Sequence, residues 1–169
     1  MILAVYTLLH VVISLIGIGT GLVVAAGMVR GKPLAGWTRW FLVTTILTSV
    51  TGFFFPVHKF MPSHAVGILS LILLGLAVYA RYRMGMVRGW RTTYVVGAMV
   101  GLYLNVFVLV VQLFAKVPAL KAMAPTQTET PFKAAQGTVL LAFVVWGILA
   151  VRGFRGAERR TNVGELSTA

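Results

Sequence analysis

The sequence predicts an all-α fold: a polytopic membrane helical bundle of five transmembrane helices, with its N-terminus outside and its C-terminus in the cytoplasm. Hydrophobic residues make up 59% of the 169 residues and charged residues only 11%, whereas roughly a quarter of the residues in a soluble domain are charged. Five apolar runs each approach the length of about 20 residues that a helix needs to cross a bilayer. The basic residues fall mainly on one side of these runs, as they do in membrane proteins of fixed orientation.

The five apolar runs form a single transmembrane domain, residues 1–152, which is followed by a polar cytoplasmic tail, residues 153–169. The runs lie at about 2–29, 39–57, 63–82, 92–115 and 133–152. We expect helices because a backbone in hydrocarbon must satisfy its own hydrogen bonds, and because the runs do not alternate as barrel strands do. The first run lacks the basic start of a secretory signal and is too long for its apolar core, so we expect an uncleaved span.

Three of the predicted spans carry a stripe of small and polar residues at helical spacing, which places each stripe on one face. The stripes are Thr7, His10, Ser14, Gly17, Gly21 and Ala25 in the first span, Thr44, Thr48 and Gly52 in the second, and Tyr94, Gly97, Gly101, Asn105 and Gln112 in the fourth. Gly17 and Gly21 form a small-xxx-small pair that lets another helix approach closely. We expect the stripes to face one another, because hydrocarbon offers a polar side chain no partner.

His10 lies roughly 12 Å below the outer surface at about 1.5 Å per residue, a depth similar to that of Thr48, Asn105 and Gln112. We therefore predict that these four residues form a small polar centre in the outer half of the bundle, which could bind a cofactor. The simpler interpretation is a set of interhelical hydrogen bonds that only fixes packing, each worth about 0.6 kcal/mol.

Two histidines lie in the short exterior turn between the second and third spans. His58, Met61 and His64 offer two nitrogen donors and a thioether, a set that suits copper better than magnesium or calcium. Alternatively, His64 and His10 could be the axial ligands of a b-type haem. The competing interpretation is an ordinary interfacial turn, because the amphipathic imidazole suits the headgroup region and no nearby carboxylate is present to orient a metal-bound ring.

The long exterior connection, residues 116–133, contains three prolines. Pro118 is expected to open a short interfacial helix, since proline is favoured at the first helical position. Thr130 followed by Pro131 is expected to cap and begin the fifth span.

Positive charge is distributed unevenly between the two sides. All ten arginines and Lys32 lie in residues 30–39, in residues 81–91 and in the segment from Arg152 onward; the other side has only Lys59, Lys116, Lys121 and Lys133. This asymmetry places the arginine-rich side in the cytoplasm. The formal net charge of +12 is then a topology signal and an attraction to anionic lipid, and nucleic acid is not expected as a partner.

Several kinds of chemistry have no residues to support them. The chain has no cysteine and no aspartate, and its three glutamates lie outside the apolar runs. Disulfides, thiolate metal sites, iron–sulfur clusters and paired-carboxylate hydrolysis are therefore excluded. Acid–base catalysis would rest on histidine alone, so an enzyme is not the favoured interpretation.

The segments TSVTGFFFPVHKFMPSHAVGILSL (48–71) and LNVFVLVVQLFAKVPALKAMAPTQTETPF (104–132) resemble a group of small, uncharacterised multi-pass bacterial membrane proteins. The resemblance covers most of the five spans. It implies a multi-pass protein of the bacterial inner membrane with the same topology, and it implies no activity.

Three functions compete. The favoured hypothesis is a non-catalytic accessory, assembly or scaffold subunit that acts through helix–helix contacts, as a homo-oligomer or within a membrane complex, among membrane lipids. The alternative is a small redox or metal protein that binds b-type haem, copper or quinone near the exterior face, through His10, His58, His64, Asn105 and Gln112. A transporter of a small solute is the third, supported only by the polar stripes, because no internal repeat or intramembrane charge accompanies them.

Overall fold

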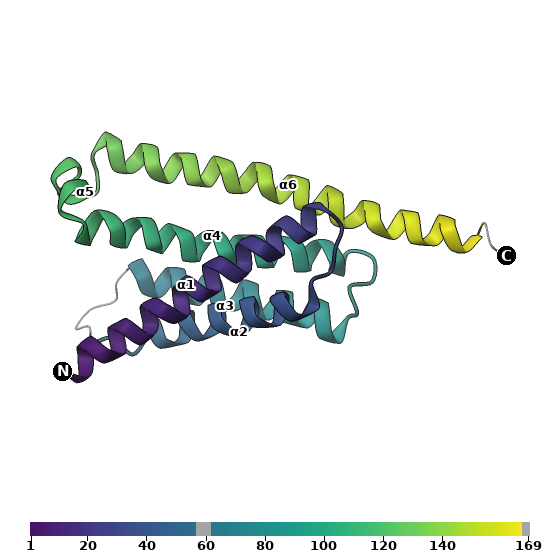
Figure 1. Cartoon of the computed structure of the whole chain (residues 1–169), viewed down its shortest axis with the longest axis horizontal. Helices are drawn as coiled ribbons and strands as arrows, with labels where there is room; N and C mark the ends of the chain where they lie inside the picture. The colour runs from purple at the N-terminus through teal and green to yellow at the C-terminus, as the bar shows by residue number, and fades with distance from the viewer. Residues whose placement is uncertain (57–61, 167–169) are drawn as a thin grey trace.

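The structure, a computed structural model, describes the backbone of residues 1–56 and 62–166 and the side chains of residues 1–56 and 63–154. In these residues the chain forms helices and turns, without a strand, so the all-helical bundle is confirmed. The elements are α1 (Ile2–Val29), α2 (Ala35–Gly52), α3 (Pro62–Val78), the π-helical turn η1 (Tyr79–Arg83), α4 (Trp90–Lys116), α5 (Pro118–Met123) and α6 (Thr130–Leu166). Figure 1 shows the long helices running side by side, with α1 crossing the others obliquely.

Four stretches of the described helices are long and apolar enough to cross a membrane. They are α1, residues 63–83 of α3 and η1, α4, and residues 130–154 of α6. The second predicted span is present as the helix α2, but it does not reach the same apolar character. Arg39 and a series of threonines lower its hydropathy, and α2 is not among the four stretches that meet the length and apolarity of a membrane span.

The helix bounds agree with the predicted runs for α1 and differ most for α2 and α6. α2 begins and ends several residues earlier than the predicted run 39–57. The backbone leaves the helix at Phe53, where the amides of Phe53 and Phe54 bond to carbonyls only three residues back. The short helix predicted after Pro118 is α5. α6 begins at the Thr130–Pro131 pair and continues to Leu166, beyond the predicted end of the fifth run.

The apolar core lies in the half of the bundle nearest the arginine-rich connections. It combines the C-terminal half of α1, the N-terminal half of α2, the C-terminal half of α3 and the N-terminal half of α4 with Ala150 and Phe154 of α6. Its largest fully buried apolar members are Met28, Phe41, Leu74, Tyr94 and Leu102. The N-terminal half of α1, by contrast, is largely exposed, so the opposite half of the bundle is packed less densely.

Two glycines bring helix backbones into direct contact in this core. A Cβ at Gly97 of α4 would lie 2.7 Å from the Leu73 carbonyl oxygen of α3, and a Cβ at Gly153 of α6 would overlap the Val29 carbonyl of α1. Both neighbours are backbone atoms that cannot move away cheaply. The absence of a side chain therefore allows α3 to dock on α4 and α6 to dock on α1.

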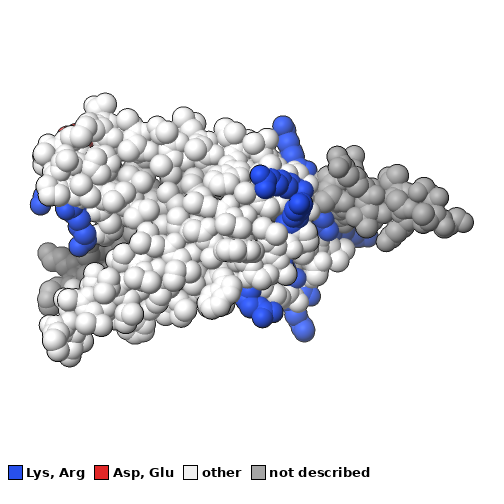
Figure 2. All heavy atoms as spheres, in the orientation of Figure 1, with Lys and Arg blue, Asp and Glu red and all other residues white. Residues whose placement is uncertain are grey.

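The basic side chains gather at the two ends of the molecule. Figure 2 shows a wide uncharged band between a dense blue group at the end that carries the arginines and a smaller group at the lysine end. Trp37 and Trp40, at the start of α2, are exposed at the arginine end, as expected of indoles at a membrane boundary.

Candidate functional site

Polar side chains from α1, α2 and α4 meet between these helices in two adjacent groups. We call them the polar interface, which comprises Tyr6, His10, Ser14, Thr45, Thr51 and Asn105. The groups lie near the middle of the helices and toward the end opposite the arginine-rich connections, the part of the bundle that the stripes in the sequence predict. The prediction that His10 and Asn105 lie on faces that meet inside the bundle agrees with this arrangement.

The first group surrounds His10. The His10 Nδ1 lies 2.8 Å from the Thr51 hydroxyl, and the Tyr6 hydroxyl donates to the Thr51 carbonyl. The Thr51 hydroxyl also lies 2.7 Å from the Leu47 carbonyl of its own helix; with its one hydrogen directed to that carbonyl, the His10 Nδ1–H is the donor to Thr51. The imidazole packs nearly perpendicular to the Phe55 ring, with 5.1 Å between the ring centroids.

This hydrogen-bond direction determines what His10 can do. A histidine that activates a hydroxyl nucleophile accepts the hydroxyl proton, and the His10–Thr51 pair has the opposite polarity. The same tautomer leaves Nε2 with a lone pair, and no described residue donates to it. The pair therefore fixes the imidazole between α1 and α2 and leaves one nitrogen that could accept a proton or a metal ion.

The second group lies about one helical turn further along α1. The Ser14 hydroxyl donates to the Asn105 Oδ1 at 2.8 Å, and the Asn105 Nδ2 approaches the Ser14 carbonyl at 3.5 Å. Asn105 is only 7% exposed, so the two residues form a nearly dry bridge between α1 and α4. Such bridges in membranes contribute about 0.6 kcal/mol on average.

Gly17 makes room for this bridge. A Cβ there would lie 3.1 Å from the Thr45 hydroxyl oxygen and 3.3 Å from the Asn105 Nδ2, tighter than ordinary van der Waals contact. The Thr45 hydroxyl is buried without a hydrogen-bond partner in the described part of the chain. The polar groups around Gly17 are thus packed closely together and do not line an open chamber.

The other residues of the predicted polar centre lie elsewhere. Thr48 donates to the Thr44 carbonyl of its own helix at 2.9 Å. This bond satisfies its hydroxyl within α2 and does not connect it to His10. Gln112 is exposed on α4, almost two turns beyond Asn105. The four residues predicted to converge are therefore divided among separate contacts, and of these four only His10 and Asn105 bond to another helix within the described residues.

The predicted histidine–methionine set can be located only in part. His58 and Met61 lie outside the described residues. The His64 ring lies 5.7 Å from the Phe53 ring, while His10 packs on Phe55, so both histidines lie near the C-terminal end of α2. Within the described residues, no three histidines or acids come together in a way that could hold a metal ion, and the copper and haem sites stay predictions.

Sequence reasoning missed the partners that the structure gives to His10 and to α6. Tyr6 and His10 are four residues apart on one face of α1, and this spacing could have indicated a joint contact. Gln136 of α6 donates to the Phe107 carbonyl of α4 at 3.2 Å, and Gln127 donates to the Val111 carbonyl at 3.0 Å. These amides tie the start of α6 to α4, which no periodicity in the sequence signals.

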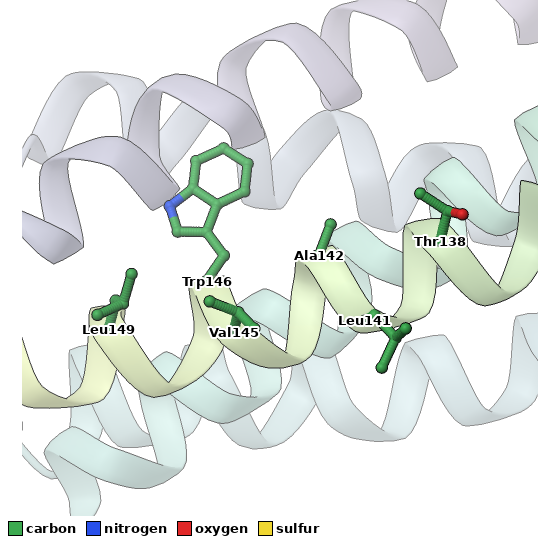
Figure 3. Close-up of a pocket in the computed structure, with 6 residues that line it drawn as sticks. All are labelled: Thr138, Leu141, Ala142, Val145, Trp146 and Leu149. Atoms are coloured by element: carbon green, nitrogen blue, oxygen red, sulfur yellow. The ribbon is translucent and has the colours of Figure 1, made fainter.

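The outward side of α6 has a different character. An open apolar hollow of about 540 Å³ lies on its surface, lined by Thr138, Leu141, Ala142, Val145, Trp146 and Leu149. Figure 3 shows that all of these side chains come from α6 itself. Only 6% of the spanning window of this helix is buried, against 50% for α4. The hollow is therefore a surface feature that faces the surroundings of the bundle.

No known family, curated protein or solved structure matches this chain in the comparisons.

Proposed function

We propose that this chain is a multi-pass protein of the bacterial inner membrane that spans the bilayer five times, with its N-terminus outside and its C-terminus in the cytoplasm. The length of α2 supports a fifth span, because 18 residues extend about 27 Å, close to a hydrocarbon core of about 30 Å. Its hydroxyls are also largely satisfied within the helix. Thr44 and Thr51, for example, donate to the carbonyls four residues back at 2.7 Å, which lowers the cost of placing them in lipid.

The proposed orientation rests on charge. The described arginines lie in or beside the connections at one end of the bundle, and exposed Lys116 and Lys121 lie at the other end. An excess of arginine and lysine marks the cytoplasmic side. A reporter fused to the C-terminus should therefore be active in the cytoplasm, and periplasmic activity would refute the orientation.

Within the membrane, the protein is proposed to act as a non-catalytic accessory, assembly or scaffold subunit through helix–helix contacts. The observation that carries this proposal is the exposed face of α6. Ala134, Thr138 and Ala142 follow one another at four-residue steps and are all exposed. Small residues at this spacing let a second transmembrane helix approach closely, and the packing inside the chain does not use them.

The polar interface supports the same function indirectly. Except for the Thr45 hydroxyl, its hydroxyl and amide groups bond to one another or to the backbone, and the His10–Thr51 pair lacks the direction that nucleophilic catalysis requires. Directional contacts of this kind give the bundle a defined shape, which a subunit that works by docking needs.

Ala142→Phe tests this proposal, because it places a bulky ring on the small-residue face. In mild detergent the wild-type protein should have the mass of an oligomer or of a complex with another membrane protein, and the variant should shift toward the monomer. Ile72→Phe on α3 is the matched control, since Ile72 is 57% exposed on a different helix. A monomeric wild type, or an equal effect of both variants, would refute the docking role.

A second candidate, a small redox or metal protein, is favoured by one observation: no residue in the described part of the chain bonds to the His10 Nε2. An absorption spectrum and a metal analysis of the purified protein test it directly. A Soret band or stoichiometric copper that disappears in His10→Leu would support this function. A wild-type preparation with neither signal would remove its haem and copper forms.

A further inference from the structure

A second apolar groove follows the line where α4 and α6 meet. It is open to the surroundings of the bundle, has a volume of about 480 Å³, and is lined by residues that include Met99, Tyr103, Phe143, Val144, Gly147 and Arg152. All of these are apolar or aromatic except Arg152, at the arginine-rich end. The groove therefore combines a long apolar floor with one cationic group at its mouth.

The groove has the length of one lipid leaflet. Its lining along α6 extends from Leu140 to Arg152, which is about 18 Å at 1.5 Å per residue. One half of a hydrocarbon core is about 15 Å thick. A chain lying in the groove would therefore reach from the middle of the bilayer to the headgroup level at Arg152.

Arg152 has no counter-ion in the described structure. It is exposed and makes no hydrogen bond or ion pair with the described side chains. The only acid among them, Glu129, precedes the start of α6, about 33 Å away along the helix. Neighbouring Arg91 is already engaged, because it donates to the Phe154 carbonyl at 3.1 Å and lies over the Phe154 ring.

We propose that this groove binds one anionic phospholipid, with an acyl chain between α4 and α6 and its phosphate paired with Arg152. The planar guanidinium matches a phosphate with two parallel hydrogen bonds. Basic residues next to grooves between transmembrane helices are suited to anionic headgroups. Gly147 keeps the floor open, since a Cβ there would meet nothing within 4 Å. This lipid site does not depend on the proposed scaffold role.

Native mass spectrometry of the purified full chain provides the test, with phosphatidylglycerol and phosphatidylcholine of identical acyl chains as probes. The wild type should bind one phosphatidylglycerol more tightly than phosphatidylcholine. Arg152→Gln should weaken phosphatidylglycerol binding about fivefold, the equivalent of the roughly 1 kcal/mol that one basic residue contributes near a membrane surface, and should remove the preference. Arg83→Gln, an exposed arginine at the same end, should preserve it.

A second pair of variants tests the apolar floor. Gly147→Leu should fill the groove and weaken both lipids, while it favours the helix over the wild-type glycine. Gly137→Leu, an open position on the same helix outside the groove, should leave both affinities unchanged.

Four results would overturn the proposal: equal affinity of the wild type for both lipids, equal effects of the two arginine variants, no effect of Gly147→Leu, or displacement of phosphatidylglycerol by inorganic phosphate at comparable concentration. The last result would indicate an anion site without an acyl-chain site. Circular dichroism should show that each variant retains its helical content, so that a loss of lipid is not a loss of fold.

Discussion

Two regions of the molecule contain the same kinds of small and polar residue but differ in how closely these residues are packed. One is the polar interface between α1, α2 and α4, and the other is the outward side of α6. At the interface, Gly17 has polar atoms within 3.1 to 3.3 Å of where a Cβ would be, whereas Gly137 and Gly147 of α6 have nothing within 4 Å. The small residues of the first region pack against other helices of the chain, whereas those of the second region are not covered. Residue type alone therefore does not distinguish a contact inside the chain from a surface that could bind another molecule.

The two regions also differ in how much they contribute to the stability of the bundle. The interface combines close backbone approach with a few directional hydrogen bonds, such as that between Ser14 and Asn105. The outward side of α6 gives the isolated bundle almost no burial. Substitutions in the first region should therefore change unfolding, and those in the second should change association or lipid binding.

The largest effect is expected where α6 docks on α1. Gly153→Ala places a methyl group on the Val29 carbonyl, and because backbone must move, the free energy of unfolding should fall by about 3 kcal/mol, the upper part of the range for overpacking. Gly147→Ala on the same helix should be neutral or should stabilise by up to about 1 kcal/mol. Denaturation in detergent followed by circular dichroism measures both, and similar losses would remove the distinction between the two faces.

An intermediate effect is expected at Asn105. Asn105→Leu removes both contacts with Ser14 and should lower the free energy of unfolding by about 1 kcal/mol. The exposed Gln112 on the same helix provides the control, and Gln112→Leu should change stability very little. A double-mutant cycle with Ser14→Ala should give a coupling of about 0.6 kcal/mol; a coupling of zero would mean that the bridge contributes nothing.

A smaller effect is expected at His10, which is only partly buried. Thr51→Val should cost about 0.6 kcal/mol and should release the imidazole from its fixed tautomer. Nitrogen-15 NMR of labelled histidine should find the proton on Nδ1 in the wild type and a mixture of tautomers in Thr51→Val. A proton on Nε2 in the wild type would contradict the hydrogen-bond direction assigned here.

The smallest effect is expected in the loop that leads into α6. Desolvation raises the pKa of Glu129, but hydrogen bonds from the Thr126 hydroxyl and from the amides of Thr126 and Thr128 outweigh it and lower this pKa from its ordinary value. The folded state therefore gains stability above the ordinary pKa of a glutamate and loses it as the pH falls through the lowered pKa.

The wild type should therefore lose slightly more thermal stability on acidification than Glu129→Gln does. The measurement is the melting temperature of both proteins at neutral pH and at about pH 3, below the ordinary carboxylate range. Identical acid dependence would show that the carboxylate does not hold the loop.

The helical bundle was predictable because long apolar runs identify membrane helices. The polar face of α1 was predictable because its polar residues recur at helical spacing, which places them on one face. The exposed position of Gln112 was not predictable, because a single polar residue does not show whether its part of the helix faces a neighbouring helix or the outside of the bundle. The end of α2 was not predictable, because the helix ends in a turn at Phe53 and phenylalanine is not a residue type that indicates a turn. The long reach of α6 was hidden because a polar helix and a polar tail share the same composition.

The length of α6 has a mechanical consequence. From Thr130 to Leu166 it is one uninterrupted helix of 37 residues, about 55 Å long, and it passes the end of the other helices in Figure 1. Such a rod acts as a lever whose pivot lies where Gly153 meets α1. The 13 residues beyond this pivot extend about 20 Å, so a tilt of roughly 10° would move the far end by about 3 Å. Movement at the membrane-facing side of this helix would thus be carried, without any change within the rod, to its C-terminal end.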